Sequence, residues 1–314
     1  MADDVGDAGV SEAAGARGVT GRGGGPLVHD EGRFRSADGL ALHWRRWRDP
    51  AAPTVGVLVN LHGLGDHSGL YPMVADWFAP RGWPVYAMDL RGNGRSEGQR
   101  GYVARWREFR RDLATFLALV RAHEPDGPCV VMGSSLGGLV ALDFALETSG
   151  AGAGAGALAL AGVVAVAPPL GALGVPPVLM ALGRVLSRLW PRFSLEAGMD
   201  LSGLARDPRI VEAVLADPLF HRRGTARLST EVTATIARVQ AGAARITTPL
   251  LLLHGAADRM VPPDGSRAFV ARARTRPGAD VAYLEYPEGY HALLADLDGA
   301  RVLADVAAWL AARA

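Results

Sequence analysis

A glycine-flanked serine between an apolar run and a helix-like segment constrains the fold of this chain more than any other feature. Residues 133–137 read G-x-S-x-G, and the apolar run 129–132 precedes them. A sharp strand-to-helix turn leaves no room for Cβ atoms two residues before and after the serine, so glycine is favoured at both places. Such a turn lifts the serine out of the sheet and places N–H groups of the following helix beside developing negative charge. The pattern predicts Ser135 as a nucleophile and the N–H of Leu136 as an oxyanion donor.

Two downstream loops carry an acid and a base in the order Ser, Asp, His. The apolar run 249–253 leads to Asp258, and the run 281–286 leads to His291. All three side chains then follow the carboxyl end of a strand, which is the edge where open parallel sheets build their sites. We therefore expect Asp258 and His291 to complete a catalytic triad with Ser135.

Other histidines and acids fit these roles less well. His254 ends a strand directly before a glycine turn, so packing is the simpler interpretation. His221 lies in a basic loop, for which surface exposure is the simpler interpretation. Asp264 is a fallback acid, but its position before the predicted helix 265–274 is typical of a helix cap.

A His-Gly turn follows the apolar strand predicted at 55–61. Such a loop supplies the second oxyanion donor in this type of site, which we assign to the N–H of Leu64. The spacing of His62, Asp66 and His67 also suggests metal ligands. However, the chain has no HExxH motif and its only cysteine is Cys129, so we predict no metal site.

Taken together, these motifs resemble the monoacylglycerol lipase and lysophospholipase branch of the α/β-hydrolase superfamily, a serine aminopeptidase-like group. The matching segments are residues 62–68 (HGLGDHS), 89–98 (DLRGNGRSEG), 133–138 (GSSLGG), 206–208, 217–219, 254–259 and 290–291. The resemblance covers nearly everything after residue 30. It implies an α/β-hydrolase fold, with a mostly parallel eight-stranded sheet flanked by helices and an inserted helical cap. It also implies hydrolysis of monoacylglycerol- or lysophospholipid-like esters through an acyl-enzyme, without a cofactor.

The chain departs from this branch where the substrate headgroup is bound. Members that prefer monoglycerides carry an acid and an arginine around the oxyanion turn, and a polar residue three positions after the histidine. Here these positions hold the shorter Asp66, the apolar Leu70 and the apolar Leu294. A pocket with fewer hydrogen-bonding groups discriminates less between polar headgroups. A broad carboxylesterase or a thioesterase is thus the alternative. A catalytically silent ligand-binding hydrolase is disfavoured because all three triad residues are present.

The domain organisation follows from the alternation of strand-like and helix-like segments. We predict core segments at 27–169 and 247–314, interrupted by a helical cap at 170–246. Within the cap, apolar side chains are predicted to line an acyl channel or to touch a lipid surface, with ordinary core packing as the alternative. These are Leu179, Met180, Leu186 and Trp190. Residues 148–183 carry no charge, but clustered glycines and prolines argue against a membrane span.

Composition limits the partners. The 314 residues carry a formal net charge of +1, and this near-neutral balance argues against a nucleic-acid binder, for which a concentrated basic surface is expected. A single cysteine excludes an intrachain disulfide, and segment 1–26 is Gly-rich, lacks an apolar signal region and is expected to be disordered. We expect a cytoplasmic protein whose cap contacts membranes peripherally. Acyl length, headgroup, the open or closed state of the cap and oligomeric state are left open.

Overall fold

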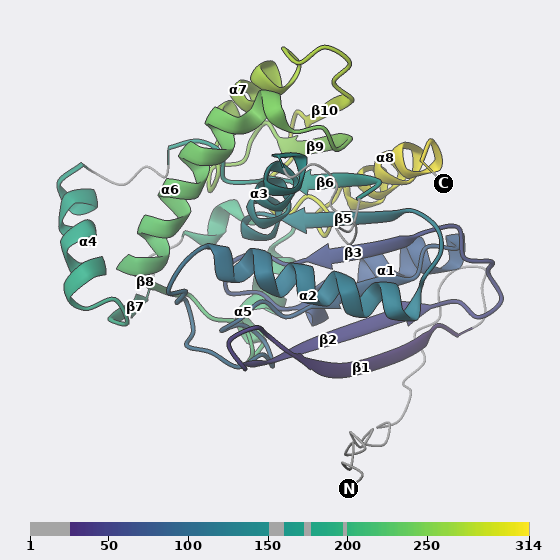
Figure 1. Cartoon of the computed structure of the whole chain (residues 1–314), viewed down its shortest axis with the longest axis horizontal. Coiled ribbons are helices and arrows are strands. Elements are labelled where there is room, and N and C mark those ends of the chain that lie inside the picture. Colours follow the sequence, from purple (N-terminus) through teal and green to yellow (C-terminus); the bar gives the residue numbers. More distant parts are fainter. Residues whose placement is uncertain (1–25, 151–159, 173–176, 197–199, 314) are drawn as a thin grey trace, which may run out of the picture.

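The computed structural model describes residues 26–150, 160–172, 177–196 and 200–313 (Figure 1). Apart from Pro26, the N-terminal segment predicted to be disordered lies outside these ranges.

The described residues form an eight-stranded sheet in the order β1-β2-β4-β3-β5-β6-β9-β10. Its strands are β1 (Val28–Arg35), β2 (Ala41–Arg48), β3 (Val57–Leu61), β4 (Val85–Met88), β5 (Cys129–Ser134), β6 (Gly162–Val166), β9 (Leu250–Gly255) and β10 (Val281–Tyr286). The first two form a hairpin, with Gly39 at φ 90° in its turn. β2 pairs antiparallel with β4, and all further neighbours are parallel. The predicted mostly parallel sheet is confirmed.

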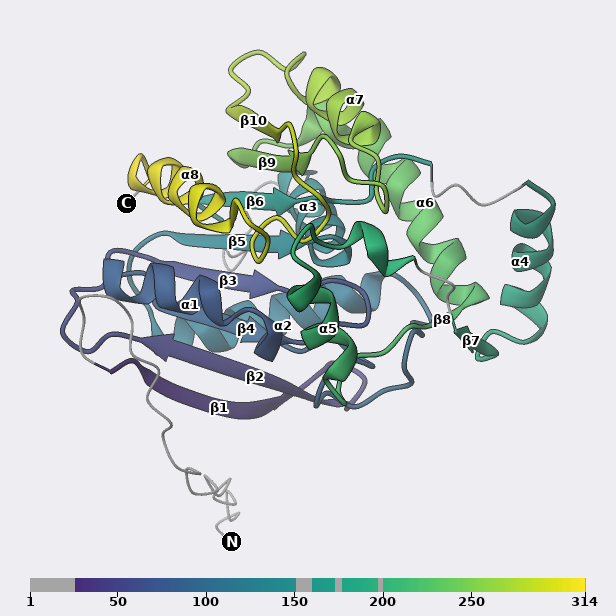
Figure 2. The ribbon, with the colours of Figure 1, turned by 180° about the vertical axis from the view of Figure 1, so that it is seen from behind.

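Helices cover both faces of the sheet because the central strands carry apolar side chains on both faces. The helices of the core are α1 (Pro72–Phe78), α2 (Arg107–His123), α3 (Leu136–Gly150), α7 (Asp264–Ala273) and α8 (Gly299–Ala311). On β3, Val57 and Val59 belong to the apolar cluster of α2 and α3, whereas Leu58 belongs to that of α1 and α8. Figure 1 shows α2 and α3 in front of the sheet, and the reverse view in Figure 2 brings α1 and α8 forward.

The segment between β6 and β9 interrupts this alternation, and we propose that it is the cap expected at 170–246. Its described elements are α4 (Pro177–Leu189), β7 (Ser194–Glu196), a 3₁₀ turn (Leu201–Gly203), α5 (Pro208–Ala216), β8 (Arg223–Thr225) and α6 (Ala226–Gly242). α6 buries Leu228, Ile236 and Val239 in the same cluster as α3. α4 packs on α6 and stands apart from the sheet in both views (Figures 1 and 2).

Ion pairs fix α6 to the core. The carboxylate of Asp143 on α3 is fully buried and pairs with Arg238 of α6 and, at 3.1 Å, with Arg110 of α2. Trp106 donates its indole N–H to the same carboxylate over 2.8 Å. Because removing one partner leaves a buried charge uncompensated, this cluster holds α6 firmly in place.

The uncharged run 148–183 spans β6 and parts of α3 and α4, and some of its residues lie outside the described ranges. In the part of the chain that the structure describes, none of the helices combines the length and the apolar character needed to cross a bilayer.

Candidate active site

Ser135 occupies a strained turn between β5 and α3. Its backbone φ is +50°, which is unusual for a residue with a Cβ. A Cβ at Gly133 would lie 2.3 Å from the carbonyl oxygen of Gly137, and a Cβ at Gly137 would lie 2.5 Å from that of Leu61. Both glycines are therefore required by close approach of the backbone. The Ser135 N–H donates to Val166 O at 2.8 Å, which anchors the turn on β6.

Asp258 and His291 lie beside each other on the loops that follow β9 and β10. His291 Nδ1 and Asp258 Oδ2 are 2.7 Å apart. The other carboxylate oxygen, Oδ1, accepts the N–H groups of Met260 and Val261, each at 2.9 Å. Burial opposes ionisation, but the hydrogen bonds from His254, His291 and the backbone together hold the pKa of Asp258 well below its usual range. An ionised Asp258 fixes His291 with its proton on Nδ1, which leaves Nε2 free to act as a base.

The two other histidines after Ser135 have different partners. His254 is fully buried, with Nδ1 2.8 Å from Ser266 Oγ and Nε2 2.8 Å from Val261 O. His221 Nε2 lies 2.9 Å from Asn93 Oδ1. Both are engaged in structural contacts. Asp264 lies in the first turn of α7, whose N-cap residue is Pro263, so the predicted capping role is wrong.

The oxyanion loop, defined here as residues 62–68, follows β3. His62 is fully buried; its Nε2 accepts the N–H of Leu90 at 2.9 Å, so its Nδ1 donates to Gly63 O at 2.7 Å. The hydrogen bond from His62 Nδ1 to Gly63 O orients the Gly63–Leu64 peptide. Leu64 and Leu136, the two residues predicted to provide oxyanion donors, both lie on the wall of the cavity that Ser135 lines.

The residues considered as metal ligands have other partners. Asp66 Oδ2 accepts the hydroxyl proton of Tyr71 at 3.0 Å, and His67 pairs with Asp217 of the cap. Among the described residues, no group of three or more His, Cys, Asp or Glu side chains is arranged to hold a metal ion.

The cavity in front of Ser135 has a volume of about 770 Å³. Ser135 and His291 both line it, together with three of the predicted substrate-binding residues, Asp66, Leu70 and Leu294. Apolar side chains from the cap form the facing wall. They are Leu201, Leu204, Ile210, Val214, Phe220, Leu228 and Val232.

The four residues predicted to line an acyl channel, three on α4 and Trp190 directly after it, do not line this cavity. Leu179 and Trp190 are 55% and 59% exposed, and Met180 and Leu186 are half-buried without reaching the cavity wall. The prediction is wrong for these four because α4 packs on the outer side of α6. The cap side of the cavity wall is made instead by the 3₁₀ turn with the residues after it, by α5, by Phe220 and by the first turns of α6.

Sequence reasoning also missed Tyr71. Its hydroxyl accepts the N–H of Gly63 at 3.3 Å and donates to Asp66, so it joins two residues of the oxyanion loop. Burial, together with the nearby Asp66 carboxylate, raises the pKa of Tyr71 well above its usual value, so the phenol stays protonated. A tyrosine directly after the HGxGxHSGL segment was the only available signal.

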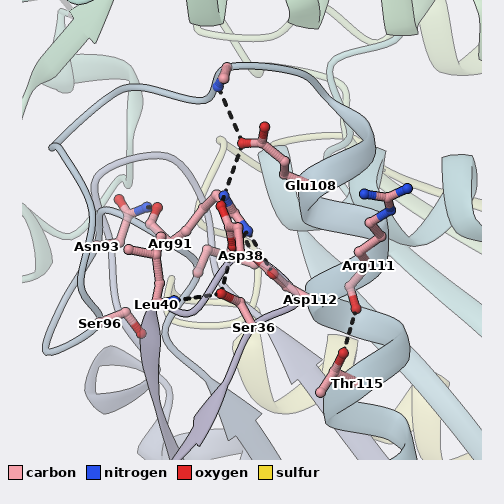
Figure 3. Close-up of polar contacts among 12 residues, drawn as sticks. Ser36, Asp38, Leu40, Arg91, Asn93, Ser96, Glu108, Arg111, Asp112 and Thr115 are labelled. Carbon is pink, nitrogen blue, oxygen red and sulfur yellow. Dashed lines mark hydrogen bonds and ion pairs between the residues drawn. The ribbon is translucent and has the colours of Figure 1, made fainter.

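The loop after β4 supports the oxyanion loop from behind. Asp89 is fully buried, and its Oδ1 accepts both the N–H and the hydroxyl of Ser68, at 2.7 and 2.6 Å. Arg91 binds Asp112 through two nitrogens at 2.6 and 2.8 Å, and also pairs with Asp38 and Glu108 (Figure 3). Neither Asp89 nor Arg91 lines the cavity. Their contacts therefore support the loops rather than the cavity wall.

The sheet order, the serine turn after β5 and the helical segment between β6 and β9 define an α/β-hydrolase fold. A family model described as serine aminopeptidase, S33, matches residues 52–298. The chain belongs to this family. This confirms the resemblance drawn from its motifs.

Relatives and solved structures agree with this assignment. The monoacylglycerol lipase of Mycolicibacterium smegmatis is 33% identical over 292 residues, covering 90% of this chain and 97% of the relative. Human monoglyceride lipase is 30% identical and covers 83% of each chain. The crystal structure of Paleococcus ferrophilus monoacylglycerol lipase superposes with a TM-score of 0.74 at 29% identity, covering 92% of this chain and 99% of that one.

Proposed function

We propose that this chain is a carboxylic ester hydrolase that cleaves single-chain acyl esters resembling monoacylglycerols or lysophospholipids. One observation carries the proposal: Ser135 and His291 line the same apolar cavity, and His291 is bonded to the buried, ionised Asp258. The lipase names of the relatives support this class of substrate.

The roles follow from the geometry. His291 Nε2 takes the proton of Ser135 as its Oγ attacks the ester carbonyl, and Asp258 stabilises the imidazolium that forms. The N–H groups of Leu64 and Leu136 hold the oxyanion of the tetrahedral intermediate. His291 then protonates the leaving alcohol. A water molecule, activated by the same histidine, releases the fatty acid from the acyl-enzyme.

The cavity matches a single acyl chain with a small headgroup. Its volume of about 770 Å³ falls within the range of small-molecule sites, and its cap-side wall is aliphatic and aromatic. On the other side of the cavity, the side chains of Asp66 and Tyr71 provide a few polar groups at the oxyanion loop. We propose that Asp66 accepts a hydrogen bond from a hydroxyl of the leaving alcohol, while Leu70 and Leu294 contact it through apolar surface.

A broad carboxylesterase is the second candidate, and a specific observation favours it. Leu70 and Leu294 both line the cavity, and neither can hydrogen-bond a glycerol hydroxyl. A site with few polar contacts to the alcohol accepts many alcohols. Thioesters could be attacked by the same triad, so they belong in the substrate panel.

We also propose that α4 contacts lipid surfaces. Val178, Leu182, Val185 and Leu189 recur at intervals of four, three and four, so they share one helix face, and they are 53–80% exposed. Residues 177–195 contain no acidic side chain and three arginines, at 184, 188 and 192. An apolar face bordered by cations is the arrangement with which a helix lies in the headgroup region of an anionic membrane.

The test is active-site labelling followed by a panel of esters. A fluorophosphonate should label the wild-type chain at Ser135 and leave Ser135→Ala unlabelled. The rate of hydrolysis is then compared among substrates that share one fatty acid: monoacylglycerols, a lysophospholipid, alkyl esters and thioesters. The order of these rates gives the preference for the leaving group. A chain that is not labelled and hydrolyses none of them is not the hydrolase proposed.

A further inference from the structure

We propose that Asp217, at the C-terminal end of α5, is a positioning residue that holds the oxyanion loop from the cap side. The inference rests on the proposed function, since it concerns the loop that carries the Leu64 N–H. The relevant part of the cap is residues 201–221, called the strap below. It runs from the 3₁₀ turn through α5 to His221.

The first contact joins Asp217 to His67 of the oxyanion loop. His67 Nδ1 accepts the N–H of Gly69 at 3.1 Å, so Nε2 carries the ring proton and donates it to Asp217 Oδ2 at 3.0 Å. The His67 side chain is only 5% exposed. The second carboxylate oxygen of Asp217 accepts the N–H of Leu219 at 2.8 Å, which fixes the carboxylate in the strap. Asp217 therefore holds both the end of α5 and the oxyanion loop.

The second contact is between backbones and lies next to Leu64. The N–H of His221 donates to the carbonyl oxygen of Gly65 at 3.1 Å. Gly65 has φ +79°, and a Cβ there would lie 2.0 Å from the carbonyl oxygen of His221. The strap thus lies directly against the turn that presents the oxyanion donor. Asp89 holds the neighbouring Ser68 from the core, so the loop is fixed from two sides.

The other end of the strap holds the loop of the proposed base. Ala292 N–H donates to Leu204 O at 2.7 Å, and His291 N–H donates to Gly203 O at 3.4 Å. Arg206 adds a charged contact, because its Nε donates to Asp296 at 3.0 Å. One segment of the cap is therefore bonded to both catalytic loops, with α5 as the spacer between them. This arrangement gives the strap a direct influence on the distance between the base and the oxyanion donors.

The experiment compares two aspartates that flank the same helix. Asp207 is the N-cap of α5, and its side chain accepts the N–H of Arg209; Asp217 likewise accepts an N–H two residues on. Only Asp217 reaches the oxyanion loop. Since removing a whole oxyanion donor costs about 10²–10³ in kcat, displacing one by Asp217→Ala should cost at least about tenfold. KM and the dependence of rate on acyl length should be unchanged, and Asp207→Ala should keep the wild-type kcat.

A double-mutant cycle with His67 tests whether Asp217 acts through its contact with His67. His67→Asn keeps an acceptor for the Gly69 N–H but no longer reaches Asp217, so it should reproduce the kcat loss of Asp217→Ala. The double variant should be no slower than either single variant, because all three lack the same contact. Fluorophosphonate labelling rates, measured on chains shown to be folded by circular dichroism, should fall in parallel with kcat.

Several results would overturn the inference. These are an unchanged kcat in Asp217→Ala, an equal loss in Asp207→Ala, or a double variant with the product of the two single losses. In each case a wild-type chain that is labelled and active leaves the proposed function standing. A wild-type chain without labelling or activity removes the proposed function, and the positioning role with it.

Discussion

Asp258 Oδ2 lies 2.7 Å from His291 Nδ1, while the nearest nitrogen of the other candidate base, His254, is 3.5 Å from the same oxygen. His254 is also enclosed by Ser266 and Val261, whereas His291 faces the cavity. The acid therefore orients the histidine on the β10 loop. This geometry favours His291 over His254 as the base of the proposed triad.

We accordingly expect Ser135→Ala, His291→Ala and Asp258→Asn each to lower ester turnover by about 10³ or more. Folding should change little in the first two, because these side chains face the cavity. Steady-state kinetics and thermal unfolding of each variant provide the measurement. If His291→Ala kept its rate while His254→Ala lost it in a folded protein, the base would be misassigned.

The cavity predicts a dependence of rate on acyl length. Each methylene that enters the apolar wall contributes about 0.8 kcal/mol, or roughly fourfold in kcat/KM. Val214 on α5 lines the cavity, whereas Val211 on the same helix lines a separate surface pocket. Val214→Phe should shift the optimum to shorter acids and Val211→Phe should leave it unchanged. Leu179→Ser should also leave the dependence of rate on acyl length unchanged when soluble esters are used. Equal effects of the two valine variants would contradict the assignment of Val214 to the cavity wall.

The alcohol side of the cavity predicts weak headgroup selection. Asp66 is the acid that the oxyanion loop itself contributes to the cavity wall, and each hydrogen bond is worth about 1 kcal/mol, so monoacylglycerols should be preferred over alkyl esters by less than roughly a hundredfold. Asp66→Ala should remove most of that preference, and Tyr71→Phe, which frees Asp66 from one bond, should retain it. Competition assays between a monoacylglycerol and an alkyl ester of the same acid measure the ratio of their kcat/KM values. A preference that survives Asp66→Ala would assign recognition to other groups.

Stability should depend on pH through His221. Burial and the nearby Arg100 lower the pKa of His221 to about 4, below the value of about 6.5 for an exposed histidine. As pH falls, the unfolded chain binds this proton first, so the folded state loses stability progressively from about pH 6.5 down to pH 4 and not above that window. His221→Gln cannot titrate and should show a smaller decrease in the free energy of unfolding between pH 7 and 4.5. Urea unfolding at several pH values measures how the free energy of unfolding depends on pH in the wild type and in His221→Gln. The same dependence in both proteins would exclude His221 as the cause.

The exposed face of α4 predicts membrane binding that is separable from catalysis. Leu182→Ser combined with Val185→Ser should weaken binding to vesicles of phosphatidylcholine and phosphatidylglycerol, because about 1.5–3 kcal/mol of burial is lost per side chain. Hydrolysis of a soluble short-chain ester should be unchanged. Leu297→Ser is the control, because Leu297 is also exposed, at 65%, but lies before α8. Vesicle sedimentation that fails to distinguish the two variants would refute the role of α4.

The sequence predicts the core strands well and suggests the order of the candidate site residues, because both rest on short-range patterns. The glycines around Ser135, the apolar strands before Asp258 and His291, and the hairpin turn at Gly39 are all local. The direction in which α4 points is not local: periodicity defines its apolar face but not what that face meets. The same holds for the His67–Asp217 contact, which joins residues 150 positions apart. Tyr71 was missed because the pattern of residue types does not show that its hydroxyl reaches Gly63 and Asp66, eight and five residues earlier in the chain.

The backbone at Ser135 restricts which nucleophiles this scaffold can accept. At φ +50°, a β-branched side chain is a genuine conformational outlier, whereas an unbranched one is tolerated with strain. A threonine at position 135 would retain a hydroxyl nucleophile, but its β-branched side chain would not fit this backbone conformation. A cysteine would fit the backbone and would replace the hydroxyl with a thiol. The backbone of this turn thus accepts a thiol at the nucleophile position without rearrangement, whereas a threonine there requires the turn itself to be rebuilt.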